Sequence, residues 1–322
     1  MADILNFINN FCAILWEAMP FVILGAVIAG ILEELLPQQW LTKLLPKSVL
    51  PAVMIGGVLG LLFPMCECGI VVVMRRLLRK GLPLSSCIAY MLAGPIVNGV
   101  VILSTWIAFR DHKIGPEMVG FRIGFGFLVA VVTGLIVHAY HRKHGNALLT
   151  PLAMPQGAAT DEDAPAEKKS LGQKIGNISS TALHDFVDIM VFLIIGSAIA
   201  AVVKMYLTPN DFATLSKEQP YLSIPVMMVL AFLLCLCSEA DAFVAASFTS
   251  MHVSAKLGFL VLGPMLDIKL LLMYTRVFRL RLILTIATCV VVQVLVYSVL
   301  VHVVYQANGW TGMSGALRPG GP

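Results

Sequence analysis

Four of the seven cysteines occur as two pairs in which one residue separates the thiols. The segment CEC places Cys66 and Cys68 on either side of Glu67, and the segment CLC contains Cys235 and Cys237. Thiolates are soft ligands that suit Cu(I), Zn²⁺ and, through the same softness, trivalent arsenic. An unwound turn can present both sulfurs of such a pair together, which a regular helix does not. The pairs are therefore candidate ligands if the protein handles a metal or a metalloid; the alternative is that they pack as small apolar side chains.

Acidic residues lie close to these cysteines. Four carboxyl groups fall inside or next to apolar stretches: Glu67, Glu239, Asp241 and Asp267. A charge in such a place costs a few kcal/mol, and carboxyl groups there usually line a pathway or carry protons. The alternative for each is a helix end near water. Lys269, two residues after Asp267, is a candidate counter-ion, although a regular helix would place these two side chains on different faces.

Two Gly-Pro dipeptides interrupt apolar stretches downstream of the cysteine pairs. In Gly94-Pro95 and Gly263-Pro264 the proline removes a helical hydrogen bond, and the glycine permits close packing or an unusual turn. Asn98 and Asp267 follow three residues after the prolines and bring oxygen atoms to the interruptions. A simple helix kink is the alternative. We expect both dipeptides, Asn98 and Asp267 to contribute to a substrate site.

The surrounding chain has the composition of an integral membrane protein. Of its 322 residues 58% are hydrophobic and 12% are charged, whereas soluble domains are about 25% charged. The net charge of +4 comes mainly from loop lysines and arginines and does not indicate a nucleic-acid partner. The N-terminal residues lack the basic start and the cleavage site of a secretory signal peptide, so we expect the first span to remain in the mature protein.

Apolar stretches of about 17–25 residues, the length that crosses a bilayer as a helix, recur along the chain. Uninterrupted spans are predicted at about 14–36, 118–140, 182–207 and 282–305. Interrupted spans are predicted from about residue 50 to a break at Pro64, at 84–109, from about 221 to CLCSEAD, and at 255–278. The predicted domains are a transmembrane repeat (1–140), a flexible cytoplasmic linker (141–183), a second transmembrane repeat (184–305) and a disordered tail (306–322).

The two halves of the chain match in register. A shift of 169 residues places the cysteine pairs and the Gly-Pro dipeptides on each other, Asn98 on Asp267, and Phe109 on Phe278. Rare residues that recur at one offset indicate an internal duplication. Duplicated halves with paired, broken helices are typical of secondary transporters, which bind their substrate at the repeat interface near the membrane midplane.

Loop charges bear on the orientation of the halves. The basic cluster Arg75–Lys80, which we interpret as a water interface, has no counterpart at 244–249, and the second half has its own cluster at Arg276–Arg281. Because cytoplasmic loops collect Lys and Arg, this change of place favours inverted repeats over parallel ones. A re-entrant segment 50–80 that turns at CEC would give the odd number of crossings per half that inversion needs.

The segments PMCECGIVVVMRRLLRKGLP and AYMLAGPIVNGVVILSTWIAF, with SEADAF and LVLGPMLDIK in the second half, resemble the predicted permeases of the ArsP/YraQ type, a family of the bacterial inner membrane. The resemblance covers both halves and leaves out the linker and the tail. It implies a duplicated, multi-pass helical transporter whose motif lies at Cys66, Glu67, Cys68, Pro95 and Asn98. Characterised relatives export trivalent organoarsenicals, and neighbouring families are implicated in metal-ion transport. Cys235 and Cys237 are candidate ligands because of the internal repeat rather than the resemblance, because CLC is less typical of the family.

These observations predict an all-α membrane permease, a secondary-active exporter of a small soft solute such as a trivalent organoarsenical. Its predicted partners are the lipid bilayer, the substrate and protons as the coupling ion, and no cofactor is expected. The sequence does not indicate an oligomeric state. The sequence contains no GxxxxGK[ST] loop, no HExxH motif and no serine nucleophile elbow, so we expect no enzyme and no ATP drive. The alternatives are a metal-ion transporter and a membrane thiol–disulfide oxidoreductase.

Overall fold

The computed structural model describes residues 2–35, 46, 48–63, 65–110, 114–154, 171–206, 220–249, 251–310 and 312. Pro64, the middle of the predicted linker and most of the predicted tail lie outside these residues. The described chain is α-helical apart from two short 3₁₀ helices at Gly145–Leu148 and Pro151–Ala153 and an isolated bridge between Leu149 and Phe278. The all-α prediction is confirmed.

Four of the described helices are long and apolar enough to cross a membrane: α1 (Ala2–Leu35), α7 (Gly115–His144), α8 (Leu171–Tyr206) and α14 (Leu280–Ala307). They cover the four uninterrupted spans that the sequence predicts, although α1 begins at Ala2, ahead of the predicted start at about residue 14. Helix α8 begins at Leu171, inside the range 141–183 that the sequence assigns to a linker. Large apolar side chains remain exposed on the outward faces of the helices, as a lipid environment requires, among them Trp16, Leu103 and Leu284.

The remaining helices form four broken pairs: α3 (Val49–Leu62) with α4 (Glu67–Arg79), α5 (Leu84–Ala93) with α6 (Gly99–Ala108), α10 (Pro220–Leu234) with α11 (Ala240–Ser247), and α12 (Val253–Leu262) with α13 (Ile268–Val277). The breaks fall at the cysteine pairs and the Gly-Pro dipeptides. Each proline of the dipeptides lacks the N–H that would continue its helix. Asn98 and Asp267, both with an extended backbone, then cap the helices that follow.

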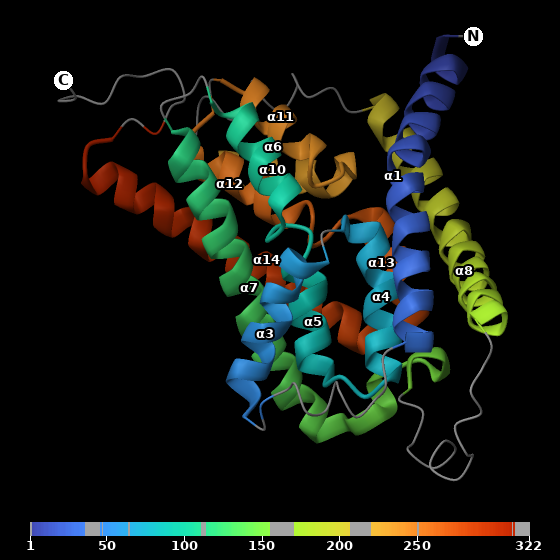
Figure 1. Ribbon diagram of the computed structural model, residues 1–322. Helices are drawn as coiled ribbons and strands as arrows, with labels where there is room; N and C mark the ends of the chain where they lie inside the picture. The colour runs from blue at the N-terminus through green and yellow to red at the C-terminus, as the bar shows by residue number, and fades with distance from the viewer. Residues whose placement is uncertain are drawn as a thin grey trace.

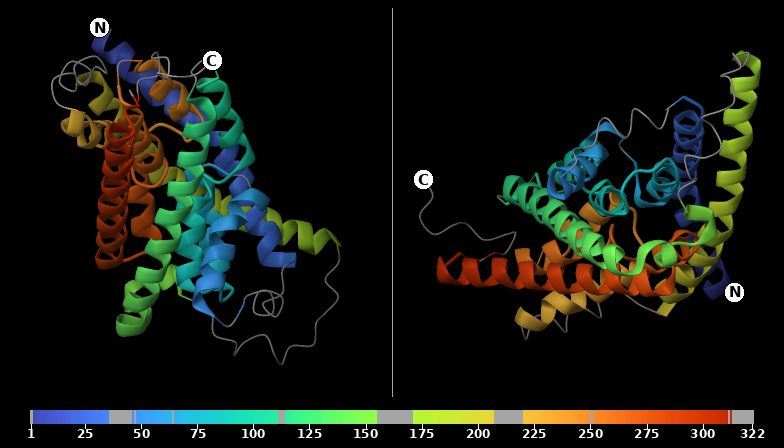
Figure 2. Two further views of the ribbon diagram at one scale, coloured as in Figure 1. Left: turned by 90° about the vertical axis from the view of Figure 1, so that its left-hand side faces the viewer. Right: turned by 90° about the horizontal axis from the view of Figure 1, so that it is seen from below.

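Side-by-side packing brings distant parts of the chain together. Helices α1 and α8 lie against each other on one flank, next to α4 and α13 (Figure 1). Helices α7 and α14 form a second pair that cross one another (Figure 2), and Gln293 Nε2 of α14 donates to Thr133 Oγ1 of α7 at 2.9 Å. The short helices pack against these long ones.

Contacts between helix ends define the two ends of the molecule, and the breaks lie between them. At one end of the molecule, Lys80 Nζ after α4 donates to the Glu33 carbonyl near the end of α1 at 2.6 Å. At the other end, Tyr305 near the end of α14 donates to Glu117 at the start of α7 at 2.7 Å. The breaks lie between these two ends (Figure 1). Gly60 of α3 packs so closely on the second break that an added Cβ would stand 2.6 Å from the Gly94 Cα.

Candidate functional site

Lys269, at the start of α13, is the centre of a buried cluster that joins the two halves of the chain. Its Nζ donates to Glu67 Oε1 at 2.9 Å and lies 3.6 Å from Asp267 Oδ2. The same ammonium donates to the Cys235 carbonyl at 3.3 Å and lies 3.8 Å from Cys237 Sγ. The side chain of Lys269 is fully buried, and that of Glu67 is 1% exposed. The first, third and fourth breaks therefore meet at one cation.

Helix termini place these groups. Glu67 occupies the first turn of α4, where the positive end of the helix dipole stabilises a carboxylate. Asp267 stands just before α13, and its Oδ1 accepts from the Leu270 N–H at 2.6 Å. Asp267 and Lys269 can face each other because the aspartate is a cap rather than a residue inside the helix. The expectation that their side chains lie on different faces is wrong for this reason.

All four paired thiols lie close to this cluster. Cys66 and Cys68 are fully buried and their thiols contact each other, and the Cys237 thiol is 3.8 Å from Lys269 Nζ. Cys235 has a left-handed backbone, with φ of 49°. That turn directs its carbonyl to Lys269, while its thiol donates to the Phe232 carbonyl at 3.5 Å.

The arrangement of the thiols bears on metal binding. Among the residues that the structure describes, no group of three or more His, Cys, Asp or Glu side chains is arranged to hold a metal ion. The four cysteines predicted as ligands therefore do not form a ready-made metal centre. Cys66, Cys68 and Cys237 instead present soft atoms next to a charged pair.

Arg122 of α7 forms a second buried charge centre. Its Nη2 donates to both carboxylate oxygens of Asp241, at 2.8 and 2.9 Å, and to the Ser238 carbonyl at 2.8 Å. Its Nη1 donates to Thr105 Oγ1 of α6 at 2.7 Å. Sequence reasoning missed Arg122; an arginine inside the apolar span 118–140 was the available signal.

The remaining predicted site residues line the breaks. Asn98 Oδ1 accepts from the Val100 and Val101 N–H groups at 2.8 and 3.1 Å, so the start of α6 already occupies this oxygen. Pro95 and Pro264 are buried. Gly263 lies beside the Asp241 carboxylate, and Glu239 is half-buried and accepts from the Ser238 hydroxyl at 3.3 Å.

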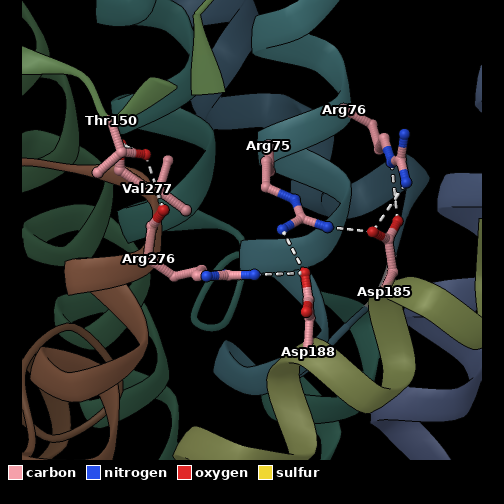
Figure 3. Close-up of polar contacts among 7 residues, drawn as sticks. All are labelled: Arg75, Arg76, Thr150, Asp185, Asp188, Arg276 and Val277. Carbon is pink, nitrogen blue, oxygen red and sulfur yellow. Dashed lines mark hydrogen bonds and ion pairs between the residues drawn. The ribbon is translucent and has the colours of Figure 1, made fainter. Parts of the chain in front are cut away.

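An arginine–aspartate network ties α8 to α4 and α13 (Figure 3). Asp185 accepts from Arg75 and, at 2.8 Å, from Arg76. Asp188 accepts from Arg75 at 3.3 Å and from Arg276 at 3.0 Å. Arg75 and Arg76 are 5% and 8% exposed. Their interpretation as a water interface is therefore wrong, because both guanidinium groups are paired inside the protein.

A membrane protein of interrupted helices that surround buried charges and thiols belongs to the class of multi-pass permeases. The comparisons with known proteins agree. A family model described as "Predicted permease", of the ArsP type, matches residues 3–303, so the chain belongs to this family. The predicted resemblance is thereby confirmed, and the family indicates a transporter rather than an enzyme.

Three relatives are similar over most of their length. UPF0718 protein YcgR of Bacillus subtilis is 38% identical over 296 residues, which cover 90% of this chain and 95% of the relative. A candidate subunit of a two-component membrane permease complex from Streptococcus mutans is 31% identical over 303 residues, 94% of this chain and 97% of the relative. UPF0718 protein YraQ of Escherichia coli is 18% identical over 265 residues, which cover 82% of this chain and 70% of the relative. No solved structure matches.

Proposed function

We propose that the protein is a secondary-active permease that exports a small soft solute, with trivalent organoarsenicals as the best-fitting class. One observation carries the proposal: the thiols of Cys66, Cys68 and Cys237 lie beside the Glu67–Lys269 pair at the point where interrupted helices meet. Interrupted helices near the membrane midplane are the usual substrate sites of secondary transporters.

Two inverted repeats are the architecture that we propose around this site. Each half has one long helix, two broken pairs and a second long helix, in the same order. In Figure 1 the tips of the α3–α4 and α10–α11 pairs point to the interior from opposite ends of the molecule. The end-to-end contacts support this arrangement, since Lys80 after α4 and Tyr221 at the start of α10 bond at opposite ends.

Thiol chemistry explains why an organoarsenical fits. When methylarsonous acid reacts with two thiols, two As–O bonds break, two As–S bonds form and two waters leave. Neutral thiols can enter this exchange, so it needs no resident metal. The contact between the Cys66 and Cys68 thiols supplies the two sulfurs, and Cys237 supplies a third soft atom next to Lys269.

We further propose that protons drive the export across the bacterial inner membrane. The chain has no nucleotide-binding loop, and buried carboxyl groups at the breaks are natural proton carriers. The name of the Streptococcus mutans relative describes a two-component complex. A second subunit is therefore included in the test below.

The test is export from cells. A bacterial strain without its own arsenic exporters is loaded with methylarsonous acid, and cell-associated arsenic is followed by mass spectrometry. The assay is run with this protein alone and again with the genes that flank its own gene. We expect export by the wild type and loss of export in Cys66→Ser/Cys68→Ser. Cys12→Ser, at an exposed position of α1, is the matched control and should export normally.

The outcomes separate the cargo from the site. If the double variant exports like the wild type, the thiols take no part. If the wild type exports no arsenical in either background, the cargo class is wrong, and the same assay with copper and zinc tests the metal alternative.

A further inference from the structure

An open cavity of about 650 Å³ lies where α13 ends and α14 begins. Its lining includes Arg279 and Arg281, the apolar side chains of Phe278 and Leu280, and Thr150 from the segment that follows α7. None of these residues belongs to either buried charge centre. The cavity is therefore a separate feature, which the proposed transport function does not explain.

Backbone hydrogen bonds fix the position of this cavity. The Arg279 N–H donates to the Leu148 carbonyl at 3.0 Å, and the Thr150 N–H donates to the Val277 carbonyl at 3.1 Å. Thr150 Oγ1 also donates to the Val277 carbonyl, at 3.1 Å (Figure 3). The segment after α7 is thereby held against the junction of α13 and α14, so the cavity has a defined lining.

Two arginine side chains in the lining lack a counter-ion. Arg276, the third arginine of this stretch, pairs with Asp188 at 3.0 Å (Figure 3). No ion pair of the described residues includes Arg279 or Arg281. Arg279 Nε donates to the Leu149 carbonyl at 3.3 Å, which leaves the terminal nitrogens of its guanidinium for a ligand. Planar guanidinium groups bind phosphate through two parallel hydrogen bonds, so the cavity suits a phosphate group.

Apolar side chains continue from the cavity along α14. Leu280 is 66% exposed and Leu284 is 56% exposed. Val291, seven positions after Leu284, is also exposed, and this spacing places the three side chains on one face of the helix. A free phosphate ion would contact only the arginines. A phospholipid would contact both parts, with its headgroup at the arginines and an acyl chain on the apolar face.

The charge distribution indicates which leaflet supplies the lipid. The last turn of α7 carries the exposed Arg142 and Lys143, and the segment after α7 leads directly to the cavity. Together with Arg276, Arg279 and Arg281, these residues concentrate positive charge at one end of the molecule. Such an end of a membrane protein usually faces the cytoplasm, where basic pockets between helices bind anionic lipid headgroups.

We propose that this cavity binds one anionic phospholipid of the cytoplasmic leaflet. Arg279 and Arg281 hold its phosphate group, and an acyl chain lies on the face of α14 that begins with Leu280 and Leu284. The bound lipid contacts the junction of α13 and α14 together with the segment after α7, and so stabilises their contact. The inference does not depend on the cargo of the permease.

The test is lipid binding by the purified full-length protein. Native mass spectrometry follows a titration with phosphatidylglycerol, and phosphatidylcholine serves as the lipid without net charge. Arg279→Gln/Arg281→Gln removes both guanidinium groups at exposed positions. We expect about thirtyfold weaker binding, since each basic residue contributes about 1 kcal/mol at an anionic surface and about 1.4 kcal/mol is tenfold.

Arg142→Gln/Lys143→Gln is the matched control, because it removes two positive charges from exposed positions at the same end but outside the cavity lining. It should bind phosphatidylglycerol like the wild type. Circular dichroism checks that both double variants fold. Phosphatidylglycerol should also raise the unfolding temperature of the wild type and of the control, and not that of Arg279→Gln/Arg281→Gln.

Four results would overturn the proposal. Arg279→Gln/Arg281→Gln could bind phosphatidylglycerol like the wild type, or the control could lose binding to the same extent, which would indicate unspecific attraction. Equal binding of phosphatidylcholine would refute the anionic headgroup. A rise in unfolding temperature with inorganic phosphate equal to that with phosphatidylglycerol would identify a site for free phosphate and refute the lipid.

Discussion

The Arg122–Asp241 pair leads to a quantitative prediction, because its contacts connect three helices. At 2.8 Å and an effective dielectric constant of about 20, the attraction between the two charges is about 6 kcal/mol, part of which desolvation offsets. Asp241→Leu leaves Arg122 buried without its counter-charge. We expect this variant to lose about 3–5 kcal/mol of stability, the usual result of removing one partner of a buried pair.

A double variant separates charge from packing. Arg122→Leu/Asp241→Leu removes both charges, and apolar replacement of a whole buried pair is often neutral or stabilising. It should recover most of the loss seen in Asp241→Leu. Thermal unfolding of the detergent-purified proteins is measured by intrinsic fluorescence, with Asp3→Leu at an exposed position as the control.

Two results would refute this reasoning. One is an Asp241→Leu protein that unfolds at the temperature of the wild type. The other is a double variant as unstable as Asp241→Leu, which would mean that the polar contacts of Arg122 with Ser238 and Thr105, rather than the charge pair, stabilise the fold.

Three further predictions concern the helices that surround the site. Gly56→Ala should destabilise the protein in the same unfolding assay, because the new Cβ would overlap the Ser86 carbonyl oxygen of α5, whereas Gly99→Ala meets open space and should be tolerated. Asn98→Ala should cost about 1 kcal/mol through loss of the α6 cap, and Asn98→Asp should retain the cap; equal unfolding temperatures would disprove the capping role. Asp185→Asn should loosen α8 from α4 and lower the unfolding temperature in the same assay; an unchanged unfolding temperature would contradict this.

Most of the fold could be predicted from sequence because its signals are local. The length of an apolar span matches the thickness of the bilayer, and a Gly-Pro dipeptide breaks a helix wherever it occurs. The start of α8 was harder to place. Residues 171–183 are polar enough to resemble a linker, but they are helical because α8 packs along α1, where Gly30 lies against the Ile178 carbonyl. Such support from a distant helix leaves no local pattern.

The site could be predicted only in part for the same reason. Cys66, Glu67 and Lys269 stood out as unusual residues in apolar stretches, but Glu67 and Lys269 are separated by 202 positions, and no local pattern pairs them. Asn98 and Asp267 were expected as ligands. Their place directly before a helix is also typical of N-caps, and both occupy that role. The cap explains their recurrence in both halves without a substrate.

The buried ion pairs of the protein differ in how completely their carboxylate oxygens are bonded. In the network of Figure 3, Asp185 bonds two arginines and Asp188 bonds two, which holds α8 to α4 and α13. Only the Lys269 cluster combines an ion pair with unbonded carboxylate oxygens on both neighbouring acids, among the ion pairs of the described residues. This cluster links α4 to α13 through the ion pair of Glu67 and Lys269. The cysteines that we propose as cargo ligands lie at the same point, so we expect binding of cargo to act on this contact.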